Sequence, residues 1–282
     1  MVDSGVGIAP APLIRAPRWR HHPYGSDALS PPPEGAVRVV ELRAALARDG
    51  VGATRAYGGA VPGPAIRGRV GDRLRLVVTN DLPVPTTFDI GGPLVRRART
   101  RGAPVAIAPG DRASVDITLR RPGVAVYGCP PPRDPADQGL LGAVIVDPPG
   151  GLDPREVEVV QVLHERDGDP LVNGCAFPFT DAYEVPCGRR VLVRVVNAGS
   201  RHHVLRLMGE RFRVVRVDGR FVAGPGLFPR DAQDVAPGES LDLELRPRAP
   251  GALLLHRHTA GSDPFDDAVA GILATIAVVP DP

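Results

Sequence analysis

Lysine is absent from this 282-residue sequence, and aromatic residues make up only 4% of it. Arginine therefore supplies all 34 basic side chains, which with 32 acidic ones leave a formal net charge of +2. The two signs are interspersed and form no basic face, so the sequence predicts no nucleic-acid partner. No apolar run approaches the length of a membrane span, and we expect no membrane partner either.

Two features of secreted proteins are also missing. Residues 1–35 are rich in proline and contain no apolar segment of the secretory type, which favours a cytoplasmic protein. The three cysteines, Cys129, Cys175 and Cys187, are odd in number and have no metal-type spacing. Cys175 and Cys187 flank a predicted hairpin and would pair in an oxidising compartment, whereas a reducing cytosol favours three thiols.

Glycine and proline, 33 residues of each, divide the chain into short segments. Apolar and polar residues alternate within these segments, which is typical of β-strands, and no βαβ pattern occurs. The sequence predicts an all-β protein with an arm at 1–35, a first domain at 36–148, a linker at 149–154 and a second domain at 155–282. Residues 39–50 have a mixed periodicity that fits either a helix or a strand continuing into a loop.

Two pairs of segments repeat along the chain, which indicates a duplicated unit. Residues 107–130 match residues 235–258, and residues 71–80 match residues 188–197. At the end of the first match, Gly-Cys-Pro in one copy stands opposite His-Arg-His in the other. The two copies have therefore kept the strand pattern and diverged in their chemistry.

The order of motifs resembles that of the multicopper oxidases, which are built from repeated cupredoxin domains. The resemblance extends from about Tyr57 to Val279 and implies two cupredoxin-like Greek-key β-sandwich domains in tandem. The segments that carry it include Tyr57–Arg67, Val70–Asp72, Asn80–Leu82, Ile107–Gly110, Gly139–Val146, Val172–Gly174, Arg194–Gly199, Phe212–Gly219 and Ala236–Glu239.

The copper ligands of that family are mostly replaced. The family places nine histidines in the motifs H-W-H-G, H-x-H, H-x-x-H-x-H and H-C-H. Eight of them hold a trinuclear copper cluster, and the first histidine of the third motif binds the type 1 copper. The first two motifs read Asp89-Ile90-Gly91-Gly92 and Gly128-Cys129-Pro130. The third keeps only His203, with Arg206 and Met208 at its later places, and the fourth reads His256-Arg257-His258.

Only His256 and His258 keep a histidine among the eight cluster positions. Arg257 stands in place of the type 1 copper thiolate, and the partner histidine position reads Ser262. A guanidinium cannot ligate copper and repels a cation, and glycine and proline offer no side-chain donor. The resemblance therefore implies a relative that has lost the type 1 and trinuclear copper sites and is not a functional laccase.

The two remaining histidines leave two interpretations open. They are two apart on a predicted strand, so His256 and His258 share a face and could hold one copper or other divalent metal. A carboxylate from Asp263, Asp266, Asp267 or Asp89 would complete such a site. Otherwise they are inherited remnants bonded to polar neighbours, and no cofactor binds. In two-domain members of the family these positions meet across subunits, which implies a homotrimer.

The replaced positions are candidate catalytic residues: Asp89, Cys129, Arg206 and Arg257. Cys129 is either a nucleophile with a histidine as base or a small buried thiol. We expect Asp89 to form a charge-assisted hydrogen bond with Arg206, Arg257 or one of the two histidines, within a subunit or across an interface. Such charges either plug the vacated cavity or form a pocket for a phenolic or anionic ligand. For His203 we expect a structural role or an acidic partner.

Three functions remain open at this point. The leading one is a copper-free relative that binds or transforms a small organic molecule in its interdomain cleft, as an enzyme or as a binding protein. The second is an oxidoreductase with a single metal at His256 and His258. The third is a structural or interaction protein whose cavity is filled by ion pairs.

The replaced thiolate leads to a direct test. We expect the purified protein, after loading with copper, to show neither the intense visible band of a Cu–thiolate bond nor oxygen consumption on a phenol, because Arg257 and Ser262 supply no type 1 ligands. Absorption spectroscopy and oxygen electrode measurements check both. A blue protein that oxidises phenols would contradict the loss of the copper sites.

Overall fold

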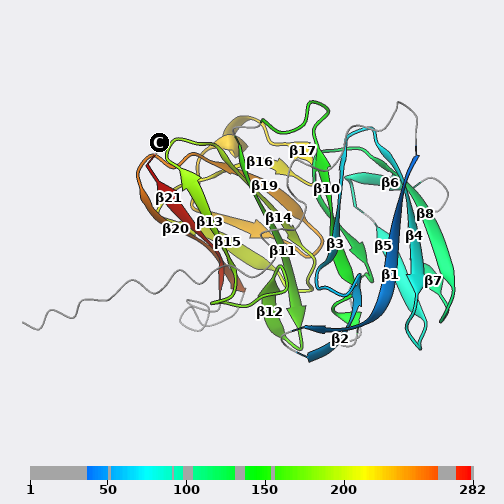
Figure 1. Ribbon diagram of the computed structural model, residues 1–282. Helices are drawn as coiled ribbons and strands as arrows, with labels where there is room; N and C mark the ends of the chain where they lie inside the picture. The colour runs from blue at the N-terminus through cyan, green and yellow to red at the C-terminus, as the bar shows by residue number, and fades with distance from the viewer. Residues whose placement is uncertain are drawn as a thin grey trace, which may run out of the picture.

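The computed structural model describes residues 37–49, 52–90, 92–97, 104–130, 137–153, 156–259 and 271–280. These residues form four β-sheets, arranged as two sandwiches in tandem (Figure 1). The all-β fold class and the two cupredoxin-like sandwiches expected from the sequence are thereby confirmed. Within these ranges, no helix has the length and apolarity needed to cross a membrane.

The first sandwich contains sheet A, in the order β2-β1-β4-β8-β6, and sheet B, in the order β3-β10-β9-β5-β7. Aromatic rings of Tyr57, Phe88 and Tyr127 pack together in its core, with centroids 5.6–6.1 Å apart. Its strands are β1 (Val37–Asp49), β2 (Gly52–Tyr57), β3 (Gly63–Arg69), β4 (Arg73–Asn80), β5 (Thr86–Ile90), β6 (Val95–Arg97), β7 (Val105–Ile107), β8 (Arg112–Leu119), β9 (Gly123–Gly128) and β10 (Leu141–Asp147).

The second sandwich contains sheet C, in the order β12-β11-β14-β19-β16-β17, and sheet D, in the order β13-β21-β20-β15-β18. A short 3-10 helix, η3 (Gly224–Leu227), precedes β18. The strands are β11 (Val157–Arg166), β12 (Asp169–Val172), β13 (Asp181–Pro186), β14 (Val191–Asn197), β15 (His203–Met208), β16 (Arg213–Val217), β17 (Arg220–Phe221), β18 (Ala232–Val235), β19 (Ser240–Leu245), β20 (Gly251–Thr259) and β21 (Ile272–Val279).

Residues 39–49 of the segment 39–50, which fitted a helix or a strand, lie within strand β1, and residue 50 lies outside the described residues. Strand β1 pairs antiparallel with β2 and parallel with β4. Leu42 and Ala44 are buried while their neighbours Glu41 and Arg43 are exposed, which is the period of two expected of a strand. Its apolar residues therefore follow the strand period, and the helical alternative is excluded.

The repeat found in the sequence is also a structural repeat. In the first sandwich Asp89 of β5 pairs with Gly128 of β9, and in the second Arg206 of β15 pairs with His256 of β20. The sequence repeat places Asp89 opposite Arg206 and Gly128 opposite His256, so the same two positions pair in both sandwiches. The register of the sheets therefore agrees with the register of the sequence repeat.

A buried asparagine recurs at the end of the equivalent strands β4 and β14. Each side-chain amide donates to two backbone carbonyls, and each side-chain oxygen accepts a backbone N–H two residues on. Because a buried amide must satisfy these bonds, each asparagine holds together the loops around its strand end. Asn80 donates to Val84 and Ile107, and Asn197 donates to Arg201 and Val235.

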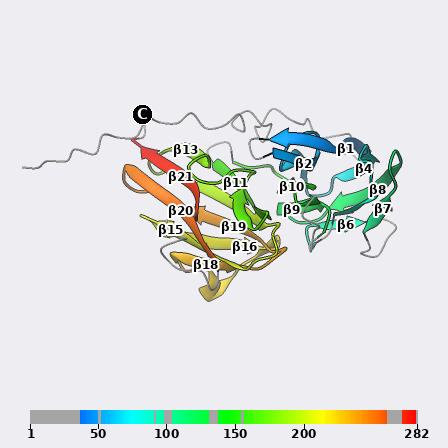
Figure 2. The ribbon, with the colours of Figure 1, turned by 90° about the horizontal axis from the view of Figure 1, so that it is seen from below.

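The four sheets lie in the order A, B, C, D, because the outer face of sheet B packs on the outer face of sheet C (Figure 2). Strands β10 and β14 are therefore buried on both faces and consist of continuous buried residues. Their contact consists of small and branched apolar side chains: Val124, Leu141, Ala143 and Ile145 from sheet B, and Val160, Val162, Val196 and Ala198 from sheet C.

Four charged side chains join the two sandwiches beside this apolar contact. Arg67 binds Asp147 and Glu158, each at 2.7 Å. Arg194, which is fully buried, lies 3.1 Å from Glu158 and 3.5 Å from Asp147, and also donates to the carbonyl of Val146. Two cations and two anions leave no net charge, which is the condition under which ions are tolerated at a buried interface.

Removing one member of this cluster should be costly. We expect Arg194→Ala to lower the free energy of unfolding by roughly 3–5 kcal/mol, because it leaves two buried carboxylates with one guanidinium. Arg75→Ala, which breaks the exposed pair with Asp116, serves as the control and should leave the thermal midpoint nearly unchanged. Equal midpoints for the two variants in thermal denaturation would show that the cluster does not join the sandwiches.

Candidate functional site

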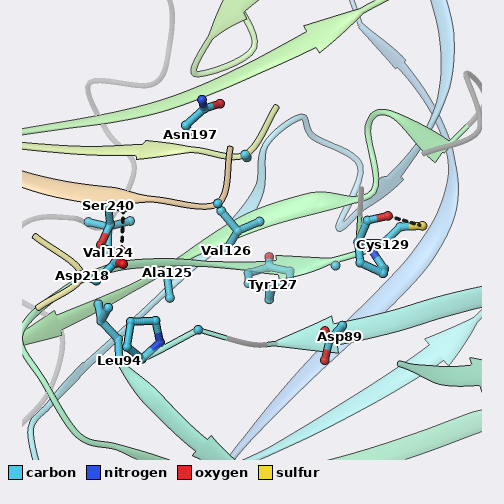
Figure 3. A pocket seen from close by; sticks show the side chains of 16 residues that line it. Asp89, Leu94, Val124, Ala125, Val126, Tyr127, Cys129, Asn197, Asp218 and Ser240 are labelled. Carbon is cyan, nitrogen blue, oxygen red and sulfur yellow. Dashed lines mark hydrogen bonds between the residues drawn. The ribbon is translucent and has the colours of Figure 1, made fainter. Parts of the chain in front are cut away.

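A cavity of about 330 Å³ lies at one end of the contact between sheets B and C (Figure 3). Strand β9 and the segment after β5 form one wall, and the ends of β14 and β19 with the β16–β17 turn form the other. It is lined by Asp89, Gly92, Pro93, Leu94, Val124, Ala125, Val126, Tyr127, Gly128, Cys129, Pro130, Asn197, Ala198, Asp218, Gly238 and Ser240. Both halves of the chain therefore contribute to one site.

The cavity coincides with the first-half positions at which the sequence resemblance places histidines. Three of these four positions, Asp89, Gly128 and Pro130, belong to its lining. The fourth, Gly91, falls outside the described residues. The space that would face copper ligands in a relative is thus bordered here by one carboxylate and two residues without donor side chains.

Gly128 could not be exchanged for a histidine without a change of backbone. Its φ is +128°, a conformation that L side chains rarely adopt. An added Cβ would also lie 2.2 Å from the carbonyl oxygen of Leu140. At the equivalent position of the second sandwich, His256 does not have a positive φ. The backbone conformation at Gly128 is therefore incompatible with a histidine side chain.

Asp89 forms an ion pair, but with a different partner from those expected. Its Oδ1 accepts a hydrogen bond of 2.7 Å from Arg97 and another of 2.8 Å from the N–H of Ile90. Arg206 and His256 lie on sheet D, and sheet C separates that sheet from Asp89. Within one chain Asp89 is therefore paired with Arg97 and not with these residues, because the two sandwiches are stacked and their equivalent sheets do not face one another. A bond across a subunit interface stays a prediction.

The second-half candidates lie on β15 and β20, away from the cavity. Arg206 and His256 form a cross-strand pair on the outer face of sheet D. Arg257 is two residues from the buried Leu255, so its side chain lies on the same, inner face. Arg206 is exposed, and His256 and Arg257 are buried. The side chain of His258 and the whole of residues 260–270, which include Ser262, Asp263, Asp266 and Asp267, lie outside the described residues.

All three cysteines are free thiols. Cys129 is buried, and its sulfur lies 3.4 Å from the hydroxyl of Thr87. Its expected base, a histidine of β20, lies on sheet D. The cavity lining contains no histidine, so the geometry within one chain agrees better with a buried thiol than with an activated nucleophile.

His203 has the acidic partner that the sequence analysis expected. Its Nε2 lies 3.8 Å from Oε1 of Glu165, and the imidazole is fully buried. Burial by itself would raise the pKa of Glu165, but the His203 imidazole and the N–H groups of Ser200 and Arg201 outweigh it and lower that pKa to about 2. The position at which the resemblance implies a type 1 copper histidine thus takes part in a carboxylate–imidazole contact.

The sequence analysis missed the residues that the second sandwich adds to the cavity. Asp218 lies in a two-residue Asp-Gly turn between β16 and β17, and its Oδ1 accepts a 3.0 Å hydrogen bond from the N–H of Ser240. Asp-Gly is a common signal for a tight hairpin, and both residues have the required positive φ. That signal predicts the turn, but only the stacking of the sandwiches brings the turn to the cavity.

The described residues do not fit a copper centre at the family positions. Asp89 is engaged by Arg97, Gly128 has no donor, and a guanidinium stands at Arg257. In the part of the chain that the structure describes, no group of three or more His, Cys, Asp or Glu side chains is arranged to hold a metal ion. Cu sites require several nitrogen or sulfur donors, and Asp89, Gly128 and Arg257 supply none to copper.

Comparison with known proteins gives a consistent result. Residues 41–151 match the profile of the multicopper oxidase family. A solved structure described as a multicopper oxidase superposes with a TM-score of 0.72 and 25% identity, and the match covers 86% of this chain and 89% of that one. The resemblance deduced from the sequence is thereby confirmed.

Curated relatives are more distant. A probable nitrite reductase-hydroxylamine oxidoreductase fusion protein of Kuenenia stuttgartiensis is 28% identical over 210 residues, which are 64% of this chain and 24% of that protein. A copper-containing nitrite reductase of Cereibacter sphaeroides is 27% identical over 167 residues, 54% of this chain and 45% of that protein. The chain thus spans between a quarter and a half of the length of these relatives.

The Glu165–His203 contact makes stability depend on pH. A carboxyl whose pKa falls on folding stabilises the fold above its unfolded pKa and loses that contribution as the pH falls from about 4.5 to about 2. We expect wild type to lose about 2 kcal/mol more than Glu165→Gln in this window, less than the full shift because solvent reaches part of the carboxylate.

Denaturant unfolding at a series of pH values measures the effect. Glu184→Gln, which changes an exposed carboxyl of β13, is the matched control and should follow wild type. Parallel stability curves for wild type and Glu165→Gln between about pH 5 and pH 2 would contradict the prediction.

Proposed function

We propose that this chain, whose residues 41–151 belong to the multicopper oxidase family, does not reduce dioxygen with copper and binds a small organic molecule in the cavity between its two sandwiches. The observation that carries the proposal is the cavity itself. It occupies the place of the family's first-half ligands and has a size within the range of small-molecule sites.

The walls of the cavity have the composition of a ligand site. Leu94, Val124 and Val126 provide apolar surface, and Asp89, Asp218 and Ser240 provide a few convergent polar groups. Ligand pockets commonly combine a mostly apolar wall with a small number of fixed polar groups, and they often lie between domains. The polar groups come from both sandwiches, so a ligand would contact both.

The charges of the lining favour one of the ligand types expected from the sequence. Asp89 and Asp218 are its charged side chains, and both are carboxylates. A carboxylate accepts hydrogen bonds and repels an anion. The cavity therefore suits a phenolic ligand, which donates an O–H, better than an anionic one.

The alternative function, an oxidoreductase with one metal at His256 and His258, has less support. His256 faces away from the core on sheet D, and the side chain of His258 and the whole of Asp263, Asp266 and Asp267 lie outside the described residues. The third reading, a cavity plugged by Asp89 with Arg206 and Arg257, conflicts with the pairing of Asp89 and Arg97. Whether a bound molecule is transformed or only held is decided by assay of the complex.

A substitution that fills the cavity tests the proposal. Val126, partly buried in the wall, is replaced by tryptophan, and the control is the same substitution at Val39, which is 55% exposed on β1. We expect wild type and Val39→Trp to bind 4-ethylphenol in titration calorimetry, and Val126→Trp to bind it at least tenfold more weakly because the indole occupies the space.

Ligand-observed NMR confirms binding independently, and circular dichroism shows that both variants are folded. If wild type does not bind the phenol at millimolar concentration, or binds it as tightly after Val126→Trp, the cavity is not the site. In either case the proposal fails.

A further inference from the structure

The two carboxylates of the cavity have different partners. The inference drawn from this difference concerns the kind of ligand and rests on the proposed function. Asp89 is paired with Arg97 at 2.7 Å, so its charge is compensated. Asp218 has no salt-bridge partner within the described residues, and its hydrogen bonds come from the N–H and hydroxyl of Ser240, both to Oδ1. Among the described residues, the carboxylate at this end of the cavity therefore has no basic side chain paired with it.

The position of Asp218 is fixed by the fold. The turn that carries it closes the β16–β17 hairpin, where Val217 pairs with Arg220. Gly219 packs so closely against the first sandwich that an added Cβ would lie 2.6 Å from Cβ of Arg121. The carboxylate is thus held by Ser240 of its own sandwich (Figure 3) and by the packing of its turn against the other sandwich.

The second oxygen of Asp218 is available to a ligand. Both recorded bonds involve Oδ1, and among the described residues no hydrogen bond to Oδ2 is present. Asn197 lines the same wall, but its amide is engaged with backbone groups and contributes shape only. A carboxylate in a partly enclosed, largely apolar site interacts with a cation more strongly than it would in water.

We propose that Asp218 is the anchoring carboxylate for a cationic group, and that the cavity takes a small arylalkylamine. The ammonium of such a ligand donates to Oδ2 of Asp218 in a charge-assisted hydrogen bond. Its aromatic body lies on the apolar wall of Val124 and Val126, and a phenolic hydroxyl reaches the Asp89–Arg97 pair, which can both accept and donate a hydrogen bond.

Three probes of equal shape and different charge test the inference: tyramine, the neutral alcohol tyrosol, and 4-hydroxyphenylacetate. We expect titration calorimetry at neutral pH to show that tyramine binds at least tenfold more tightly than 4-hydroxyphenylacetate, with tyrosol between them. Asp218→Asn keeps an oxygen to accept the N–H of Ser240, so the turn is preserved while the charge is removed.

In Asp218→Asn the affinity for tyramine should fall at least fivefold, and the affinity for tyrosol should stay within twofold of wild type. Asp234→Asn, which neutralises an exposed carboxylate of β18, is the control and should change none of the three affinities. The preference for tyramine should also weaken as salt is added, because it depends on charge.

The outcomes separate this inference from the function on which it rests. If tyrosol binds but tyramine is not preferred, or if Asp218→Asn leaves the preference intact, the role of Asp218 is wrong and the cavity remains a ligand site. If none of the three probes binds wild type at millimolar concentration, the proposed function fails and the inference fails with it.

Discussion

The contact between sheets B and C is the constraint on which the rest of the structure depends. It buries the second face of two sheets, whose first faces already form the cores of the sandwiches. A sheet that is apolar on both sides cannot stay in water, so the two sandwiches must stack. The neutral cluster of Arg67, Asp147, Glu158 and Arg194 lies beside this contact and links the two sandwiches. The cavity is the part of the contact that side chains do not fill.

Duplication has produced two sandwiches with the same register and different chemistry. Asp89 and Gly128 of the first sandwich occupy the positions that Arg206 and His256 occupy in the second sandwich. Stacking then gives the two sets different surroundings, because sheet B faces its neighbour and sheet D faces outward. An ion pair between the two sets would need a second copy of the chain, as in the expected homotrimer. Within one chain, each set has found local partners.

Two of the polar residues at the family's ligand positions have acidic or basic neighbours within their own sandwich. Glu165 lies 3.8 Å from His203 in the second sandwich, and Arg97 forms an ion pair with Asp89 beside the cavity. Asp89 is thus an ion-paired carboxylate in a partly enclosed place. Asp218 is half-buried and, among the described residues, accepts only from neutral donors, and it lies where a molecule from solvent could supply a positive charge.

The sequence by itself determined the fold class, the duplication and the register of its strands, because short alternating runs and turn residues act locally. It also determined which side chains stand at the family's ligand positions. Only the tertiary structure decided that Asp89 meets Arg97, that Asp218 reaches the cavity, and that Arg206 and His256 do not. These outcomes depend on how two sandwiches stack, and stacking depends on apolar faces such as those of Ile145 and Val160, whose partners are distant in sequence. Periodicity shows that a face is apolar, but it does not show which other face will cover it.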